Sequence, residues 1–235
     1  RKVVTRGTPN LGSYSPVMPL RGLNDNIHLL ARLDSTGIGP KALVETLVNR
    51  FPGLLQMMPS PDARRDEHWF DAGFWPKKDS LIPDAAILAA AGKAQADLPP
   101  PDDRFTQIVG LGRRTVHDVR IDKGQLFYNH NDDGDGTVPR TLAEMDGADR
   151  RFYIEGTHGQ LCNLRAAIDA CDAVLNGRVP DLAEDPAQVR SLTASLRTEP
   201  EKAMRSAARS GLPRTADPDD PAFSEQALLE GFLSA

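Results

Sequence analysis

Two strand-like runs, each followed by a polar loop rich in glycine, constrain the fold of this 235-residue chain more than any other feature. Residues 125–128 lead into an acidic loop at 131–139, which reads Asn-Asp-Asp-Gly-Asp-Gly-Thr-Val-Pro. Residues 151–155 lead into a Gly-Thr-His-Gly loop that contains His158. Polar groups on loops at the edge of a sheet are typical of functional sites. The pattern therefore predicts an α/β fold with a site at one sheet edge.

Other segments supply the remaining strands of this predicted sheet. Residues 105–109 read as a buried strand, and residues 116–121 and 125–128 alternate around an Asp-Lys-Gly turn, which predicts a hairpin. Residues 2–5 also read as a buried strand. A buried strand needs neighbours on both sides, and this chain offers them on one side only. We therefore expect a mostly parallel sheet that is the C-terminal part of a larger fold, cut just before residue 1.

Helical patterns dominate the segment between the first strand and residue 105. Helices are expected at 24–33 after an Asn24 or Asp25 cap, at 41–50 after Pro40, and at 85–96. No strand alternation occurs in this segment, so we expect a helical cap insertion over about 20–101. Its aromatic and Met-rich side chains fit either a cover over an apolar pocket or simply the core of the cap: Phe51, Leu54, Leu55, Met57, Met58, Trp69, Phe70, Phe74 and Trp75.

Helices are also expected after the hairpin. One lies near 142–145, and a longer one over 161–175 has Ala167, Ile168 and Cys171 on its apolar face. After Pro180 the sequence becomes polar and rich in Ala, Arg, Glu and Pro. The first domain therefore ends at 180, and 181–235 is expected to be a helical tail or connector with helices at 186–197, 200–210 and 223–234.

Composition excludes several classes of function. The net charge of −5 gives no reason to expect nucleic acid as a partner, because nucleic-acid binding needs clustered Lys and Arg. No apolar run approaches the roughly 20 residues of a membrane span, and no signal peptide is evident. Cys162 and Cys171, expected about 13 Å apart on one helix, should not form a disulfide. Unpaired cysteines suit a reducing compartment, so we expect a cytoplasmic protein.

Asp135 and His158 are the candidate catalytic residues. A serine hydrolase needs a base that removes the hydroxyl proton and returns it to the leaving group, and a carboxylate that holds the imidazole in the correct tautomer. Alone, Asp135 reads as a turn residue and His158 as a loop histidine. Because the two follow successive strands in the order expected of acid and base, we favour the catalytic interpretation.

The acidic loop also permits a second interpretation as a calcium site. Starting at Asn131, the EF-hand pattern is met by Asp133, Asp135 and Gly136, but Leu142 occupies the position of the required Glu. An EF-hand is therefore not expected. A calcium-stabilised regulatory domain built on Asp132, Asp133 and Asp135 remains a third hypothesis, and the favoured interpretation needs neither metal nor cofactor.

Four segments together resemble the lecithin:cholesterol acyltransferase-like branch of the α/β-hydrolase lipases. They are Gly-Thr-Pro-Asn-Leu-Gly-Ser at 7–13, Phe-Pro-Gly-Leu-Leu-Gln-Met-Met-Pro at 51–59, Gly-Asp-Gly-Thr-Val-Pro at 134–139, and His158. The resemblance covers roughly residues 1–178. It implies that Asp135 and His158 are the acid and base of a triad. It also implies ester cleavage or acyl transfer on lipid-like substrates, with 20–101 as the lid.

The nucleophile of that family is missing from this chain. No Gly-x-Ser-x-Gly pentapeptide occurs, and Ser13, Ser15 and Ser35 read as cap or loop residues. Either the serine and the oxyanion hole lie in a preceding segment or chain, or the protein is a non-catalytic binding module of the same fold. The first interpretation gives two partners, the preceding half of the hydrolase and a lipid or ester substrate, with transient contact to a membrane surface.

Overall fold

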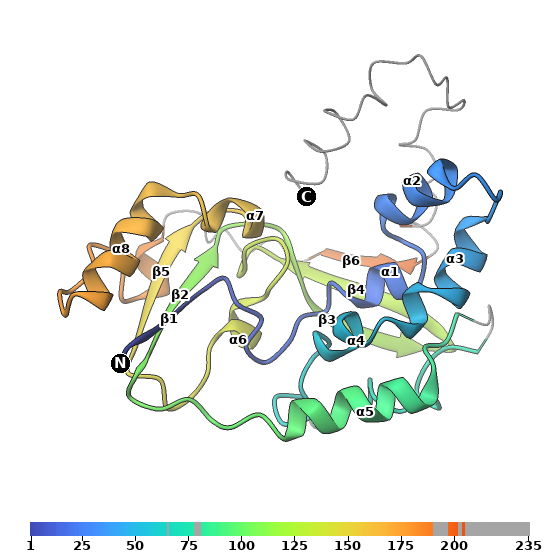
Figure 1. Cartoon of the computed structure of the whole chain (residues 1–235), viewed down its shortest axis with the longest axis horizontal. Helices are drawn as coiled ribbons and strands as arrows, with labels where there is room; N and C mark the ends of the chain where they lie inside the picture. The colour runs from blue at the N-terminus through green and yellow to red at the C-terminus, as the bar shows by residue number, and fades with distance from the viewer. Residues whose placement is uncertain (65, 78–80, 190–196, 202–203, 205–235) are drawn as a thin grey trace, which may run out of the picture.

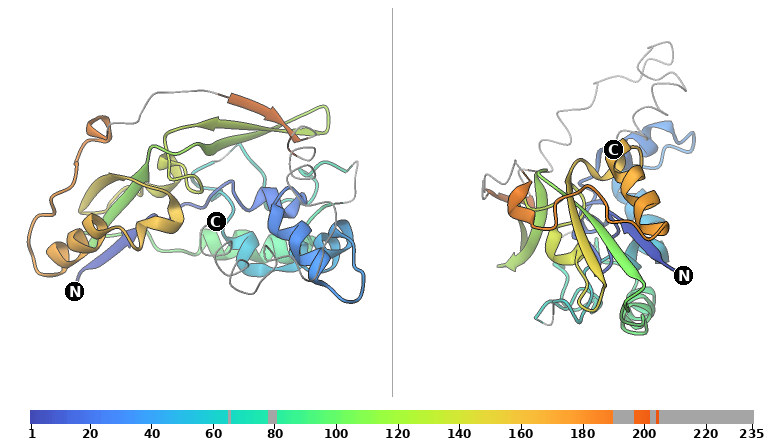
Figure 2. Two further views of the ribbon diagram at one scale, coloured as in Figure 1. Left: turned by 90° about the horizontal axis from the view of Figure 1, so that it is seen from above. Right: turned by 90° about the vertical axis from the view of Figure 1, so that its left-hand side faces the viewer.

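The computed structural model describes residues 1–64, 66–77, 81–189, 197–201 and 204. Within these ranges the chain forms one parallel and one antiparallel sheet, each of three strands, together with a group of helices (Figure 1). The α/β composition predicted from the sequence is confirmed. The parallel sheet with α8 lies at one end of the molecule and the cap helices lie at the other (Figure 2).

The parallel sheet has the order β1-β2-β5. Strand β1 is Val3–Arg6, β2 is Phe105–Leu111 and β5 is Arg150–Glu155. The central strand β2 is the most buried, because its neighbours cover both edges and side chains such as Ile108 and Leu111 are almost inaccessible. Since all three strands run in one direction, their carboxyl ends meet at a single edge of the sheet.

The two outer edges of this sheet differ. On β5, the Tyr153 N–H donates to the Ala183 carbonyl at 2.8 Å, so the segment after the last helix covers that edge. On β1, the described part of the chain supplies no strand opposite β2. Within the described residues, the β5 edge is therefore paired at one residue, whereas the β1 edge has no paired strand.

The antiparallel sheet begins with the predicted hairpin. Strands β3 (Thr115–Asp122) and β4 (Gln125–Asn131) pair directly. Lys123 and Gly124 between them have φ values of 49° and 71°. Two successive positive φ values match the twist of a two-residue hairpin turn, so this prediction is confirmed.

The third strand of that sheet corrects the predicted tail. A helix is expected over 186–197, of which 190–196 lie outside the described residues. At its start the structure has the short 3-10 helix η2 (Pro186–Gln188), and at its end β6 (Arg197–Pro200) pairs antiparallel with β4. Glu201 follows and forms a buried ion pair with Arg21 of the cap at 3.3 Å. Most of the helices predicted at 200–210 and 223–234 lies outside the described residues.

The insertion between β1 and β2, called the cap below, is a series of short helices, as the sequence pattern predicts. These are α1 (Val17–Leu20), α2 (Asp25–Leu33), α3 (Pro40–Thr46), η1 (Val48–Arg50), α4 (Pro52–Gln56) and α5 (Ala85–Ala96). The Asn24 side chain caps α2 and the Asp84 side chain caps α5, each accepting backbone N–H groups of the first turn. No helix in the described ranges is long and apolar enough to cross a membrane.

The core of the cap is aromatic and is shared with the hairpin. Trp69 lies edge-to-face against Trp75 with ring centroids 5.3 Å apart, and Tyr14 packs beside them. Leu126 and Tyr128 of β4 complete the same buried cluster. The cap is therefore fixed to the body of the protein through β3 and β4.

The last helices also differ from the prediction. The single helix expected over 161–175 is divided into α7 (His158–Leu161) and α8 (Arg165–Leu175), and α6 (Arg140–Ala143) precedes β5. The two cysteines are both free, but they do not share a helix: Cys162 ends α7 and Cys171 lies in α8. Alanines form the buried face of α8, whereas Ile168 is exposed.

Candidate active site

The loop after β1, the acidic loop and the loop after β5 converge at the carboxyl edge of the parallel sheet. Gly7 lies in the first of these loops and His158 comes shortly after β5, while Gly110 lies near the end of β2. A Cβ atom on Gly110 would lie 2.7 Å from the Cβ of Asp135, and one on Gly7 would lie 3.5 Å from Nδ1 of His158. Two glycines at strand ends thus leave the space in which the acidic loop and the histidine loop meet.

Asp135 is held firmly within this space. Its side chain is 1% exposed, and its Oδ1 atom accepts the backbone N–H groups of Thr137 at 3.0 Å and Val138 at 2.7 Å. Its Oδ2 atom lies 2.8 Å from Nδ1 of His158. The carboxylate therefore has one oxygen fixed by its own loop and the other directed at the histidine.

His158 is anchored by its backbone and accessible at its side chain. Its backbone N–H donates to the Asp135 carbonyl at 2.8 Å, and its side chain is 37% exposed. Because the Asp135 carboxylate accepts from Nδ1, the proton of the neutral ring is on Nδ1. Nε2 then carries the lone pair and has no hydrogen-bond partner among the described residues, which is the arrangement of a general base.

The hydrogen bond to Asp135 raises the pKa of His158 above its ordinary value, and the charge of Asp135 adds to this effect while partial burial opposes it.

Since a base must be neutral, we expect activity to rise with pH through a midpoint above about 6.5. The stability of the fold depends on pH in the opposite direction. The contribution of the pair to the free energy of unfolding is complete below about pH 6.5 and decreases as pH rises through the pKa of His158 in the folded protein. A pH profile of kcat/KM and a pH series of melting curves test this, and a midpoint below 6.5 would contradict it.

The acidic loop has further supports that the sequence did not reveal. The Thr115 hydroxyl accepts the Gly136 N–H at 2.8 Å and donates to the Arg113 carbonyl at 2.7 Å. The Asp133 carboxylate binds Arg140 at 2.8 Å, and this hydrogen bond raises the pKa of Arg140. Gly110 and Thr115 could have been noticed in the sequence. Gly110 interrupts the apolar strand β2, and Thr115 is the first residue of β3.

The same contacts bear on the calcium hypothesis. The carboxylate of Asp133 is occupied by Arg140, and that of Asp135 by His158 and two backbone N–H groups. Within the described ranges no group of three or more His, Cys, Asp or Glu side chains is arranged to hold a metal ion. The geometry therefore favours a hydrogen-bonded turn over a cation site.

Ser13, Ser15 and Ser35 are not bonded to the candidate base. The Ser13 hydroxyl donates to the Thr137 carbonyl, and the Ser15 hydroxyl donates to the same atom at 2.9 Å. Ser35 is exposed in the turn after α2. None of the three hydroxyls is bonded to His158, which agrees with their interpretation as loop residues.

The predicted substrate-facing residues of the cap fall into three groups. Leu55, Met58, Trp69 and Trp75 are fully or almost fully buried and form the core of the cap. Leu54, Phe70 and Phe74 are partly buried against that core, whereas Phe51 and Met57 are 59% and 43% exposed. The structure thus places most of these side chains in the packing of the cap and leaves two at its surface.

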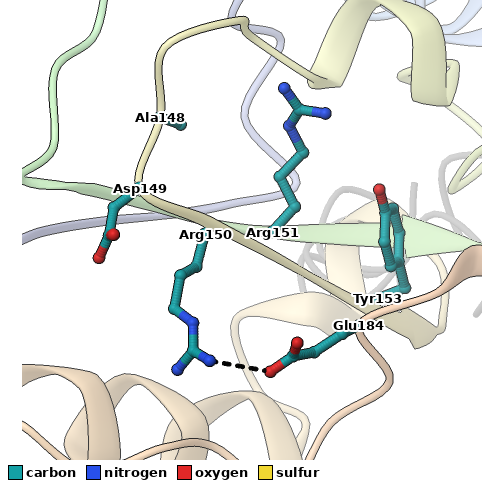
Figure 3. A pocket seen from close by; sticks show the side chains of 6 residues that line it. All are labelled: Ala148, Asp149, Arg150, Arg151, Tyr153 and Glu184. Atoms are coloured by element: carbon teal, nitrogen blue, oxygen red, sulfur yellow. Dashed lines mark hydrogen bonds and ion pairs between the residues drawn. The ribbon is translucent and has the colours of Figure 1, made fainter.

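A polar pocket of about 340 Å³ lies along the first half of β5, away from the Asp135–His158 pair (Figure 3). Arg150 binds Glu184 at 3.2 Å, and Arg151 binds Asp146 at 3.3 Å. The Tyr153 hydroxyl donates to Glu144, and burial together with this bond raises the pKa of Tyr153 to about 12. The arginines already have carboxylate partners, so the pocket shows no feature that selects a charged ligand.

Comparison with known proteins leaves the family of this chain open. No protein-family model matches the sequence, and no curated protein or solved structure matches it significantly. A proposal about function must therefore rest on the Asp135–His158 pair and the residues around it.

Proposed function

We propose that this chain supplies the acid and the base of a serine hydrolase that acts on carboxylic esters of lipid-like substrates. The observation that supports the proposal is the 2.8 Å contact between Asp135 Oδ2 and His158 Nδ1 at the carboxyl edge of a parallel sheet. A buried carboxylate that orients a half-exposed imidazole is the arrangement that activates a hydroxyl nucleophile.

The roles of the two residues follow from the atoms they present. Nε2 of His158 takes the proton of the serine hydroxyl as that oxygen attacks the ester carbonyl, and then gives it to the departing alcohol. The Asp135 carboxylate keeps the ring in the productive tautomer and stabilises the imidazolium that forms. Water as the acceptor gives esterase, lipase or phospholipase activity, and an alcohol as the acceptor gives acyl transfer.

The open edge of β1 suggests where the serine enters. A further parallel strand beside β1 would end next to Gly7, and a Cβ on Gly7 would be 3.1 Å from Oδ2 of Asp135. On the other side of the sheet, the middle of β5 is already paired with Ala183 at Tyr153. We infer that the nucleophile ends a strand of a preceding segment, in the same protein or a separate chain, that pairs with β1.

The assignment of a lipid-like substrate rests on the cap. The apolar Phe51 and Met57 side chains are exposed at the two ends of α4, where burial against an acyl chain or a membrane surface would remove them from water. The resemblance of 51–59 to the lid region of lipases points the same way.

Labelling with a fluorophosphonate tests the proposal, because such probes react with activated serines. The longest natural form of the protein should be labelled on a serine that precedes residue 1, and His158→Ala should abolish labelling. His28→Ala is the matched control, since His28 lies in α2 and its ring contacts the Gly22 carbonyl rather than Asp135. A folded protein that takes no label would refute the hydrolase and favour a non-catalytic binding module.

A further inference from the structure

The segment Ser13-Tyr14-Ser15 makes contacts that the proposed mechanism does not use. The hydroxyls of Ser13 and Ser15 both donate to the carbonyl oxygen of Thr137, across more than 120 residues of sequence. The Ser13 hydroxyl also accepts the backbone N–H of Ser15 at 3.0 Å, and Ser13 is only 2% exposed. Two buried or half-buried side chains thus converge on one backbone oxygen of the acidic loop.

That oxygen belongs to the peptide group that binds Asp135. The peptide between Thr137 and Val138 contains the Thr137 carbonyl and the Val138 N–H, and this N–H donates to Oδ1 of Asp135 at 2.7 Å. A peptide group is planar and trans, so its C=O and N–H point in fixed opposite directions. Holding the carbonyl with two hydroxyls therefore also holds the N–H on Asp135.

The loop needs such an external support. Gly136 lies between Asp135 and Thr137 with a φ of 93°. Glycine adopts this conformation readily, but because it lacks a side chain it also leaves the backbone of the loop more freedom than another residue would. If the Thr137 carbonyl lost its donors, the 137–138 peptide would be held only by contacts within the loop itself, such as the Asp135 N–H on the Val138 carbonyl at 3.3 Å. It would then rotate more easily, and the shortest backbone contact of the carboxylate would weaken.

Tyr14 connects the same segment to the cap. Its hydroxyl donates to the Glu67 carboxylate at 2.7 Å, and that carboxylate also accepts Nε1–H of Trp69 at 2.6 Å. Tyr14 is fully buried, and the Arg64 guanidinium lies 5.8 Å from its ring centroid. Successive residues of one short segment therefore bind the acidic loop and the cap core.

We propose that Ser13 and Ser15 are positioning residues, which hold the 137–138 peptide so that Asp135 stays directed at His158, and that Tyr14 anchors this clamp in the cap. The catalytic meaning of the clamp rests on the proposed function, but its effect on the Asp135–His158 contact does not. Any loosening of the cap core would be transmitted through Tyr14 to the acid of the pair.

Proton NMR of the longest natural form of the protein tests the clamp. The readout is the rate at which the Nδ1–H proton of His158, assigned by its loss in His158→Gln, exchanges with water. In Ser13→Ala/Ser15→Ala we expect exchange about tenfold faster or more, because the hydrogen bond to Asp135 opens more often. Ser15→Ala alone, at the less buried position, should show a smaller increase, and Ser15→Thr, which keeps the hydroxyl, should retain the wild-type rate.

Controls separate this effect from general destabilisation. Ser35→Ala removes a serine from an exposed turn and should leave exchange unchanged, whereas Tyr14→Phe should accelerate it. Unchanged exchange in a folded Ser13→Ala/Ser15→Ala protein would overturn the clamp, and unchanged exchange in Tyr14→Phe would overturn its link to the cap. If the protein is active, kcat of the double variant should fall roughly 10- to 100-fold with little change in KM. If it is inactive, the exchange rates still decide.

Discussion

Asp135→Asn is expected to lower kcat of the complete hydrolase about 10⁴-fold while the protein remains folded. The asparagine oxygen can still accept the N–H groups of Thr137 and Val138, so the loop keeps its turn. The asparagine NH₂ then faces His158 and donates to Nδ1, which forces the ring proton onto Nε2. A ring with its proton on Nε2 cannot accept the proton of the serine hydroxyl.

The neighbouring Asp133→Asn is the matched control for this experiment. It makes the same chemical change in the same loop, but the Asp133 carboxylate binds Arg140 and not His158. Because both partners are partly exposed, we expect kcat to change by less than about tenfold. Steady-state kinetics with a soluble ester such as p-nitrophenyl butyrate give the comparison. Equal decreases of kcat in the two variants would show that a change in loop structure, rather than impaired proton transfer, explains the effect.

Gly12→Ala is expected to be the most destabilising of the glycine-to-alanine substitutions in the described part of the chain. A Cβ at this position would lie 2.1 Å from the Met58 carbonyl oxygen and 2.9 Å from Cα of Pro59, both of which are backbone atoms. The two backbones are also paired there, since the Ser13 N–H donates to the Met57 carbonyl at 2.8 Å. Neither side can move without breaking this contact, so we expect a loss of about 4 kcal/mol or more in the free energy of unfolding.

Gly37→Ala isolates the steric part of this effect. Gly12 and Gly37 have φ values of 88° and 73°, so an alanine is strained at either position. No atom lies within 4 Å of a Cβ built on Gly37, and its substitution should cost only about 1–2 kcal/mol. Chemical denaturation of both variants measures the difference, and similar losses would show that backbone conformation, not the contact with Met58, explains the effect.

Local sequence signals are sufficient to predict strands β1 to β5. The Asp-Lys-Gly turn predicted the hairpin because positive φ values at Lys123 and Gly124 are a local requirement. Asp135 and His158 are both expected in loops at the edge of a sheet, and they do lie in contact. Asp135 follows β4 of the antiparallel sheet, whereas His158 follows β5 of the parallel sheet, so the contact also depends on the acidic loop folding back beside Gly110 of β2.

Other features depend on contacts that no local pattern encodes. The stretch 186–197 has helical composition, but its last residue begins β6, where pairing with β4 outweighs helix propensity. The predicted helix over 161–175 is broken near Leu164, which caps α8 in an extended conformation. The serines at 13 and 15 looked like ordinary loop residues, because their shared acceptor at Thr137 lies far away in sequence.

The position of the cap has an evolutionary consequence. Strands β1 and β2 are parallel neighbours, so the chain must cross from the carboxyl end of one to the amino end of the other, and the cap is this connection. A parallel crossover needs only about a dozen residues, and the rest of the insertion is free to vary in length and content. Under the proposed function, substrate preference can therefore diversify in the cap while the rest of the fold keeps the Asp135–His158 geometry. The exception is the segment Gly12–Ser15, because it contacts both the cap and the acidic loop. A substitution on one side of this segment must remain compatible with the other side.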